Sequence, residues 1–218
     1  ADGTGRVRNV SPAWESGVDD QGQSLPDEAY PDGQMALAAI EKLREYSDDG
    51  TRFCLAVGFH RPHLPFNAPK AYFDLYDPNA IPEAPNPFRA SGAPHFAFEN
   101  MGELRRYSGI PAAGQPYSTA LRRGLKWGYY AATSFIDAQV GRLLDELRRN
   151  GLEDSTLVVL WGDHGWHLGE QAVWGKHTNF ELDTRVPLIL RVPGQQPGQT
   201  SSAIVELVDL YPTITELA

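Results

Sequence analysis

The chain has 218 residues, of which 41% are hydrophobic and 22% charged, as in one globular domain or part of a larger one. Its net charge of −9 argues against electrostatic binding to nucleic acid or anionic lipid. A single cysteine excludes an internal disulfide framework and any zinc site built from several cysteines. No apolar run is long enough to cross a membrane. Residues 1–5 carry no signal region, which indicates a cytoplasmic protein or a sequence whose natural start lies elsewhere.

The first third of the chain contains an arm, a helix and a strand. Residues 1–31 are polar and rich in glycine, proline and aspartate, which predicts an irregular arm. Residues 33–46 follow a helical pattern that ends in turn residues. The apolar run 53–59 is bounded by turn signals and predicts a fully buried strand of a parallel sheet. We expect Cys54, inside this run, to be a buried and unreactive thiol.

A proline-rich segment is followed by the most regular pattern in the chain. Seven prolines in residues 78–118 predict little regular structure, which is typical of a functional loop or a mobile lid. Apolar residues then recur at helical spacing from Leu121 to Leu147, which predicts a helix of about seven turns. Ser118 is suited to cap its start, and Asn150-Gly151 to end it.

The last third of the chain completes the predicted fold. Apolar runs at 156–161 and 186–190 predict two further strands, and residues 205–211 lead into a final helix. Helices that alternate with apolar strands predict an α/β fold with a mainly parallel sheet flanked by helices.

Polar side chains gather just past the predicted strands, where ligands bind in open α/β sheets. Five of the six histidines fall in the stretches 60–66, 162–170 and 174–180. Asp163 and His164 stand between glycines at a strand tip, where a carboxylate and an imidazole can reach one divalent cation. An aspartate that caps the next helix would explain an isolated pair, but the glycines and the strand tip favour the metal site.

Further candidates lie beside this pair. His60 ends a predicted strand and could act as a general acid, or it could simply hydrogen-bond to backbone. His63 lies between two prolines, and we expect it to hold the shape of its loop. His177 could contact a substrate or make a loop hydrogen bond. His167 could complete a three-ligand zinc set with the Asp-His pair.

Lys176 follows Trp174 and Gly175 in the third of these stretches. If buried near a metal, its ammonium would add positive charge for an anionic substrate. The alternative is a solvated surface lysine, which is the common fate of this residue type.

Three segments together resemble the sulfatase family of the alkaline-phosphatase-like superfamily, and its iduronate-2-sulfatase-like branch in particular. They are residues 53–66 (FCLAVGFHRPHLPF), 160–170 (LWGDHGWHLGE) and 174–181 (WGKHTNFE). The order and spacing of these motifs carry the resemblance, which runs from about residue 12 to the end. It implies that residues 1–218 are the central to C-terminal part of a sulfatase catalytic domain with an alkaline-phosphatase-like fold, incomplete at both ends.

The resemblance also implies roles for individual residues. Asp163 and His164 would bind a divalent cation, calcium in most of the family, that holds the sulfate group. His60 and Lys176 would contact the sulfate ester and its leaving oxygen. The resemblance places substrate specificity in residues 78–118 and near two further substrate-binding candidates, Trp166 and His177.

The chain departs from the family pattern at several points. The family nucleophile is a formylglycine made from a Cys/Ser-x-Pro-x-Arg motif, and no such motif occurs here. The N-terminal Asp-Asp metal pair and the N-terminal Lys and His sulfate contacts of the family are also missing. Gln171 stands where the family has a histidine, which leaves the role of this position open.

The predicted function is metal-dependent hydrolysis of an organic sulfate ester, on a small molecule or a sugar, in the complete enzyme. We expect the isolated chain to be inactive. The alternatives are a phosphoesterase or phosphonate hydrolase of the same superfamily, a non-catalytic binding or scaffold domain, and a zinc hydrolase built on His60, His164 and His167. The resemblance implies a periplasmic, secreted or lysosomal location, and the sequence carries no signal of oligomeric state.

Overall fold

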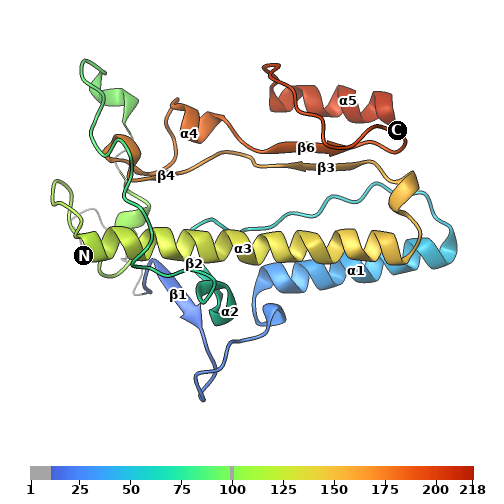
Figure 1. Cartoon of the computed structure of the whole chain (residues 1–218), viewed down its shortest axis with the longest axis horizontal. Coiled ribbons are helices and arrows are strands. Elements are labelled where there is room, and N and C mark those ends of the chain that lie inside the picture. The colour runs from blue at the N-terminus through green and yellow to red at the C-terminus, as the bar shows by residue number, and fades with distance from the viewer. Residues whose placement is uncertain (1–10, 99–100) are drawn as a thin grey trace.

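A computed structural model describes residues 11–98 and 101–218, and Figure 1 shows the arrangement of its elements. The helices are α1 (Pro31–Asp49), α2 (Lys70–Phe73), α3 (Thr119–Arg149), α4 (Glu181–Thr184) and α5 (Leu210–Leu217). The strands are β1 (Trp14–Gly17), β2 (Phe66–Pro69), β3 (Val158–Trp161), β4 (His167–Leu168), β5 (Trp174–Gly175) and β6 (Leu188–Arg191). Among the described residues, no helix combines the length and the apolar character needed to cross a membrane.

The helix α3 runs along the long axis of the molecule and confirms the helix predicted from apolar spacing (Figure 1). Ser118 caps its first turn, because the Ser118 hydroxyl accepts a hydrogen bond from the Leu121 N–H at 3.2 Å. Gly151 follows its last residues with a φ of 65°, a left-handed conformation that glycine adopts without steric cost. The helix α1 packs alongside α3 and confirms the helix predicted at 33–46.

A parallel pair of strands lies against the N-terminal half of α3. Strand β1 pairs with β2 so that Trp14 lies opposite Phe66. The Trp14 side chain packs directly onto α3 at Gly124 and Gly128, where any Cβ would lie within 2.5 Å of its atoms. The prediction of a wholly irregular arm over 1–31 is therefore wrong at β1, because tertiary contacts with α3 order a segment that has no local pattern. Residues 1–10 lie outside the described residues.

The core lies between α3, the β1–β2 pair and the proline-rich segment. Its larger cluster joins these three parts of the chain and consists of Ala13, Leu64, Phe66, Leu104, Ile110, Leu125, Ala132 and Trp174. A second cluster joins β2, α2 and α3 and consists of Ala68, Phe73, Ala131 and Phe135. Burial of these apolar side chains supplies the main free energy that holds the helices against the β1–β2 pair.

The apolar run 53–59 does not form the buried strand that its composition predicts. Residues 51–60 are not part of any described strand, and their side chains alternate between exposed and partly buried. Figure 1 shows this segment passing between α3 and the β3–β6 pair. A strand is buried only when neighbouring strands or layers cover it, and no described strand pairs with this segment. Cys54 is exposed for the same reason, so its predicted burial is also wrong.

The strands predicted at 156–161 and 186–190 form as β3 and β6, which pair antiparallel with Trp161 opposite Leu188. Several of their apolar side chains are uncovered; Trp161 is 47% exposed and Ile189 is 61% exposed. The described sheets are short, with one parallel pair and two antiparallel pairs. The final helix is confirmed as α5.

The proline-rich segment 78–118 has almost no regular structure, as predicted. Within its described residues, the regular elements are two short 3-10 turns, His95–Ala97 and Leu104–Arg106. The segment is nevertheless packed, because its apolar side chains enter the interior at Ile81, Ala84, Phe98, Leu104 and Ile110. It therefore forms one wall of the core next to the polar residues discussed below.

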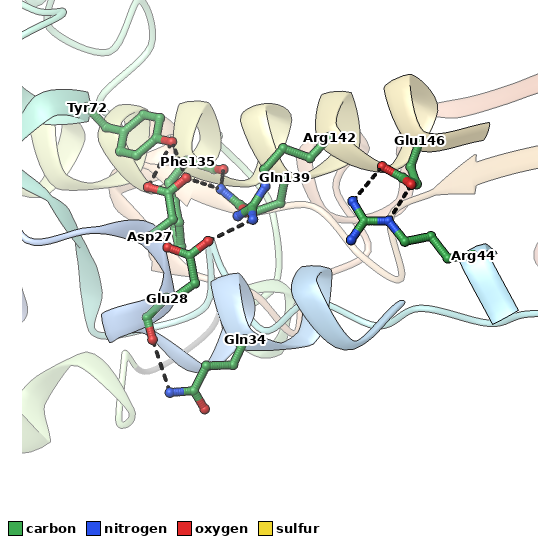
Figure 2. A network of polar contacts seen from close by, with 9 residues as sticks. All are labelled: Asp27, Glu28, Gln34, Arg44, Tyr72, Phe135, Gln139, Arg142 and Glu146. Carbon is green, nitrogen blue, oxygen red and sulfur yellow. Dashed lines mark hydrogen bonds and ion pairs between the residues drawn. The ribbon is translucent and has the colours of Figure 1, made fainter. Parts of the chain in front are cut away.

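A polar network fastens α3 to the rest of the molecule (Figure 2). The Asp27 carboxylate accepts hydrogen bonds from the Tyr72 hydroxyl and from the Gln139 side-chain amide, at 2.9 and 2.7 Å. Further along α3, the buried Glu146 carboxylate forms a two-point ion pair with Arg44 of α1, with the shorter contact at 2.6 Å. The Arg44 hydrogen bonds are the main reason that the pKa of Glu146 is lowered to about 2.

The close packing of Trp14 on α3 predicts opposite effects for two substitutions in one helix. Gly124→Ala should lower the free energy of unfolding by about 1–3 kcal/mol, because its Cβ would lie 2.3 Å from a ring carbon of Trp14. Gly141→Ala is the matched control, with no neighbour within 4 Å, and should raise it by up to about 1 kcal/mol. Urea unfolding measures both. Equal stabilisation by the two substitutions would show that Trp14 does not occupy this position.

The Glu146–Arg44 ion pair predicts a pH-dependent stability difference. Because the pKa of Glu146 lies below its ordinary 4.5 in the folded state, its contribution is complete above about pH 4.5 and disappears as the pH falls toward 2. Glu146→Gln should therefore lower the free energy of unfolding by about 1–3 kcal/mol at pH 7, by the same amount down to about pH 5, and by progressively less from there to pH 3.

The control for this substitution is Asp145→Asn, which removes an exposed ion pair with Arg148 on the same helix. It should change the free energy of unfolding by less than about 1 kcal/mol at all these pH values. A Glu146→Gln deficit that stays constant from pH 7 to pH 3 would contradict the ion-pair explanation.

Candidate active site

The loop from His60 to Phe66 carries two of the predicted residues and is fixed at both ends. The His60 backbone N–H donates to the buried carboxylate of Asp32, in the first turn of α1. At the other end, Phe66 opens β2 and is 1% exposed. The peptide bonds before Pro62 and Pro65 are cis. Sequence reasoning missed Asp32, whose single signal is an acidic side chain at a helix start.

Four side chains from three distant segments meet beside this loop. The His60 and His63 rings have centroids 4.7 Å apart, and the His63 ring lies 6.3 Å from that of Trp166. The ammonium of Lys176 lies 5.3 Å from the centre of the Trp166 ring, in a cation–π contact. The structure thus brings together three predicted residues, His60, Trp166 and Lys176, and adds His63. Lys176 is 8% exposed, so the alternative of a solvated surface lysine is wrong.

Asp163 and His164 form a local pair at the tip of β3. The Asp163 carboxylate accepts the His164 backbone N–H, and Asp163 Oδ2 lies 3.6 Å from His164 Nε2. The His164 Nδ1 lies 2.9 Å from the Gly165 carbonyl oxygen, which can only accept, so Nδ1 carries the hydrogen. In the neutral ring, Nε2 then presents a lone pair on the same side as the carboxylate. Both side chains are exposed, and they precede Trp166 of the cluster by two and three residues.

His167 does not serve as a third metal ligand, and the zinc-set interpretation is wrong on this point. Its side chain is fully buried, with Nδ1 3.2 Å from the Glu170 carbonyl and Nε2 3.2 Å from the Thr178 hydroxyl oxygen. The Thr178 hydroxyl in turn donates to Asp183 Oδ2 at 2.6 Å, and Asp183 Oδ1 lies 3.6 Å from His167 Nε2. Both ring nitrogens of His167 thus already face protein groups.

Asp183 also fixes two segments of the site relative to each other. They are the arm 163–166, which carries the Asp-His pair, and the arm 174–178, which carries Lys176. Its backbone oxygen accepts the Gly165 N–H at 2.8 Å, which anchors the arm that carries the Asp-His pair. Its side chain accepts the Thr178 N–H at 2.8 Å, which anchors the arm that carries Lys176. Gly165 is required at this contact, because a Cβ there would lie 1.8 Å from the backbone oxygen of Leu182. Sequence reasoning did not identify Asp183.

Two predicted positions remain apart from the cluster. His177 is exposed with a φ of 73°, and among the described residues its ring makes no hydrogen bond. Gln171, at the position where the family pattern has histidine, also has a positive φ, and its N–H donates to the Asn86 carbonyl. This contact binds the turn after β4 to the proline-rich segment.

Sequence reasoning also missed Glu103, which enters the cluster from the proline-rich segment. Its Oε1 lies 3.1 Å from His63 Nε2, and its Oε2 lies 3.5 Å from the Lys176 ammonium. No spacing or motif marks this residue, because its position depends on the packing of an irregular segment.

The surroundings of His60 lower its pKa below the ordinary value. Partial loss of hydration is the largest cause, and the positive charges of His63 and Arg61 act in the same direction, while Asp32 opposes them. His60 is therefore mainly neutral near pH 7 in this structure.

Within residues 11–98 and 101–218, no group of three or more His, Cys, Asp or Glu side chains is arranged to hold a metal ion. Asp163 and His164 can therefore supply only part of a coordination shell, as one oxygen and one nitrogen donor.

The order and arrangement of these elements define an α/β domain with an alkaline-phosphatase-like fold. A phosphonate monoester hydrolase from Silicibacter pomeroyi superposes with a TM-score of 0.74 and 25% identity, over 97% of this chain and 42% of that one. The predicted α/β class and alkaline-phosphatase-like fold are thereby confirmed, whereas the described strand pairs are short and two of the three are antiparallel, not mainly parallel as predicted. The sulfatase family model matches residues 8–218, and the chain belongs to the sulfatase family.

Curated relatives agree with this assignment. The chain is 34% identical to human iduronate 2-sulfatase over 89% of its own length, and 32% identical to a choline-sulfatase of Rhizobium meliloti over 86%. It spans 41% of the length of the human protein and 36% of the bacterial one.

The contact between the His60 and His63 rings predicts that a substitution of His63 changes the pKa of His60. His63→Gln should raise the pKa of His60, because it removes a positive charge that disfavours the protonated form. Two-dimensional NMR of the His60 ring across a pH series measures this shift. His177→Gln, an exposed control, should leave the His60 titration unchanged. An unchanged or lowered pKa in the His63 variant would contradict the arrangement.

Proposed function

We propose that this chain forms part of the active site of a metal-dependent sulfuric ester hydrolase. The observation that supports this most directly is the buried Lys176, which packs on Trp166 in the cluster that also contains His60 and His63, in a chain of the sulfatase family. A nearly buried ammonium loses hydration and is expected to bind an anion strongly. The substrate class is an organic sulfate ester on a small molecule or a sugar.

In this proposal, each candidate residue has one task. Lys176 binds a sulfate oxygen and stabilises the negative charge of the transition state. His60 donates a proton to the leaving oxygen after the bound anion has raised its pKa. Trp166 and His177 contact the organic part of the substrate, since the Trp166 ring packs on Lys176 and His177, which follows Lys176 in the sequence, is exposed.

The Asp163–His164 pair is suited to hold a divalent cation, which we propose to be calcium. Two ligands about 2.4 Å from one calcium ion and at right angles lie about 3.4 Å apart. The observed separation of 3.6 Å between Asp163 Oδ2 and His164 Nε2 fits that arrangement. A bound cation would neutralise charge on the sulfate oxygens. A formylglycine nucleophile, as the family resemblance implies, is not supplied by this sequence.

A phosphonate monoester hydrolase is the second candidate function, because a protein of that name has the fold of this chain. Sulfate and phosphonate esters both present tetrahedral centres, and Lys176 can bind an oxygen of either.

We further propose a periplasmic, secreted or lysosomal location, as the family resemblance implies.

The proposal predicts that Lys176 is required for turnover in the full-length protein. Lys176→Ala should reduce kcat/KM for an aryl sulfate by about 100–1,000-fold, because it removes one stabilising charge from the transition state. Removal of divalent cations with a chelator should abolish turnover, and added calcium should restore it. Release of the aryl alcohol measures both effects.

Lys70→Ala is the control, since Lys70 makes an exposed ion pair with Asp74 away from the cluster. It should leave turnover unchanged. Aryl sulfate, aryl phosphate and a phosphonate monoester assayed in parallel distinguish the two candidate functions. Turnover of the sulfate that survives Lys176→Ala undiminished would refute the proposed site.

A further inference from the structure

The carboxylate of Glu103 lies between two basic groups of the candidate site. It contacts His63 Nε2 at 3.1 Å and the Lys176 ammonium at 3.5 Å, and its side chain is 29% exposed. Lys176 is thus held between a carboxylate and the Trp166 ring, with its own side chain 10% exposed. The family roles considered above assign nothing to Glu103.

Glu103 changes the charge that an incoming anion meets. Lys176 alone would present one full positive charge in a poorly hydrated position, where charges interact strongly. With Glu103 beside Lys176, a distant ligand meets almost no net charge from the pair. A ligand that approaches the Lys176 ammonium also approaches the negative charge of the Glu103 carboxylate. The penalty from that carboxylate grows with the number of negative charges on the ligand.

Candidate substrates differ in this number. At neutral to slightly alkaline pH, a sulfate monoester or a phosphonate monoester carries one negative charge, whereas a phosphate monoester carries close to two. All three have the same tetrahedral shape at the reacting centre. Shape therefore cannot separate them at this site, but charge can.

We propose that Glu103 is a specificity-determining residue that makes the site prefer singly charged esters over doubly charged phosphate monoesters. The inference rests on the proposed function, because it concerns the same site. The Glu103 carboxylate repels the one charge of a singly charged ester, whereas it repels both charges of a phosphate monoester. A residue that only fastened the proline-rich segment to the site would affect all three esters alike.

The test compares three aryl esters in the full-length protein at pH 8. Glu103→Gln should raise the ratio of kcat/KM for the aryl phosphate to that for the aryl sulfate by about tenfold, the effect of about 1.4 kcal/mol of removed repulsion. The ratio for an aryl phosphonate monoester to the sulfate should stay constant, because both esters carry one charge. This second ratio separates charge from the identity of the central atom.

Two variants serve as controls. Glu103→Asp keeps the charge and should keep the wild-type ratio of phosphate to sulfate turnover. Glu83→Gln removes a carboxylate from the same proline-rich segment, where Glu83 pairs with Arg122, and should also leave the ratio unchanged. If Glu103→Gln does not fold, as judged by circular dichroism, Glu103→Ser removes the same charge and replaces it.

An unchanged ratio in Glu103→Gln, or an equal change for all three esters, would overturn the inference. If the wild-type protein hydrolyses none of the esters, the proposed function fails and the inference is decided by binding. Calorimetry then compares methyl phosphate with methyl sulfate. A tenfold relative gain for methyl phosphate in Glu103→Gln supports the charge role, and no relative gain overturns it.

Discussion

The contact of Trp14 with Gly124 and Gly128 sets how close the β1–β2 pair can come to α3. Because these two glycines lack side chains, the indole lies directly on the helix, and β2 follows β1 in parallel register. That register places Phe66 at the start of β2, where its ring packs edge-on against Trp166 at 5.8 Å. The loop that ends at Phe66 carries His60, so the position of the candidate site depends on how tightly one aromatic side chain packs on α3.

Two acidic residues, Asp183 and Glu103, have different tasks in the candidate site. The buried Asp183 side chain and backbone bind both the segment with the Asp-His pair and the segment with Lys176. The Glu103 carboxylate lies 3.5 Å from the Lys176 ammonium. Buried charges are costly unless they are paired, and Glu103 is the partner of the nearly buried Lys176. The geometry and the electrostatics of the site are thus set by different residues.

Local signals explain which parts of the structure could be predicted. The helix α3 has a long apolar period and a serine cap, so its bounds follow from sequence. The motifs past the predicted strands named His60, Trp166 and Lys176, which the structure brings into one cluster. The run 53–59 failed because burial of a strand depends on neighbours that no local pattern encodes. Glu103 and Asp183 were missed for a related reason. Each contacts residues from other segments of the chain, and no local pattern in the sequence indicates those contacts.

The shared anchor at Asp183 has a consequence for how such a site can diversify. Since one residue fixes both the segment with Asp163 and His164 and the segment with Lys176, a change there would disturb both at once, and neither could be adjusted alone. The proline-rich segment is less restricted, because it contributes to the cluster through one side chain, that of Glu103. New substrate preferences can therefore arise by substitution in that segment, while the reacting groups keep their mutual geometry.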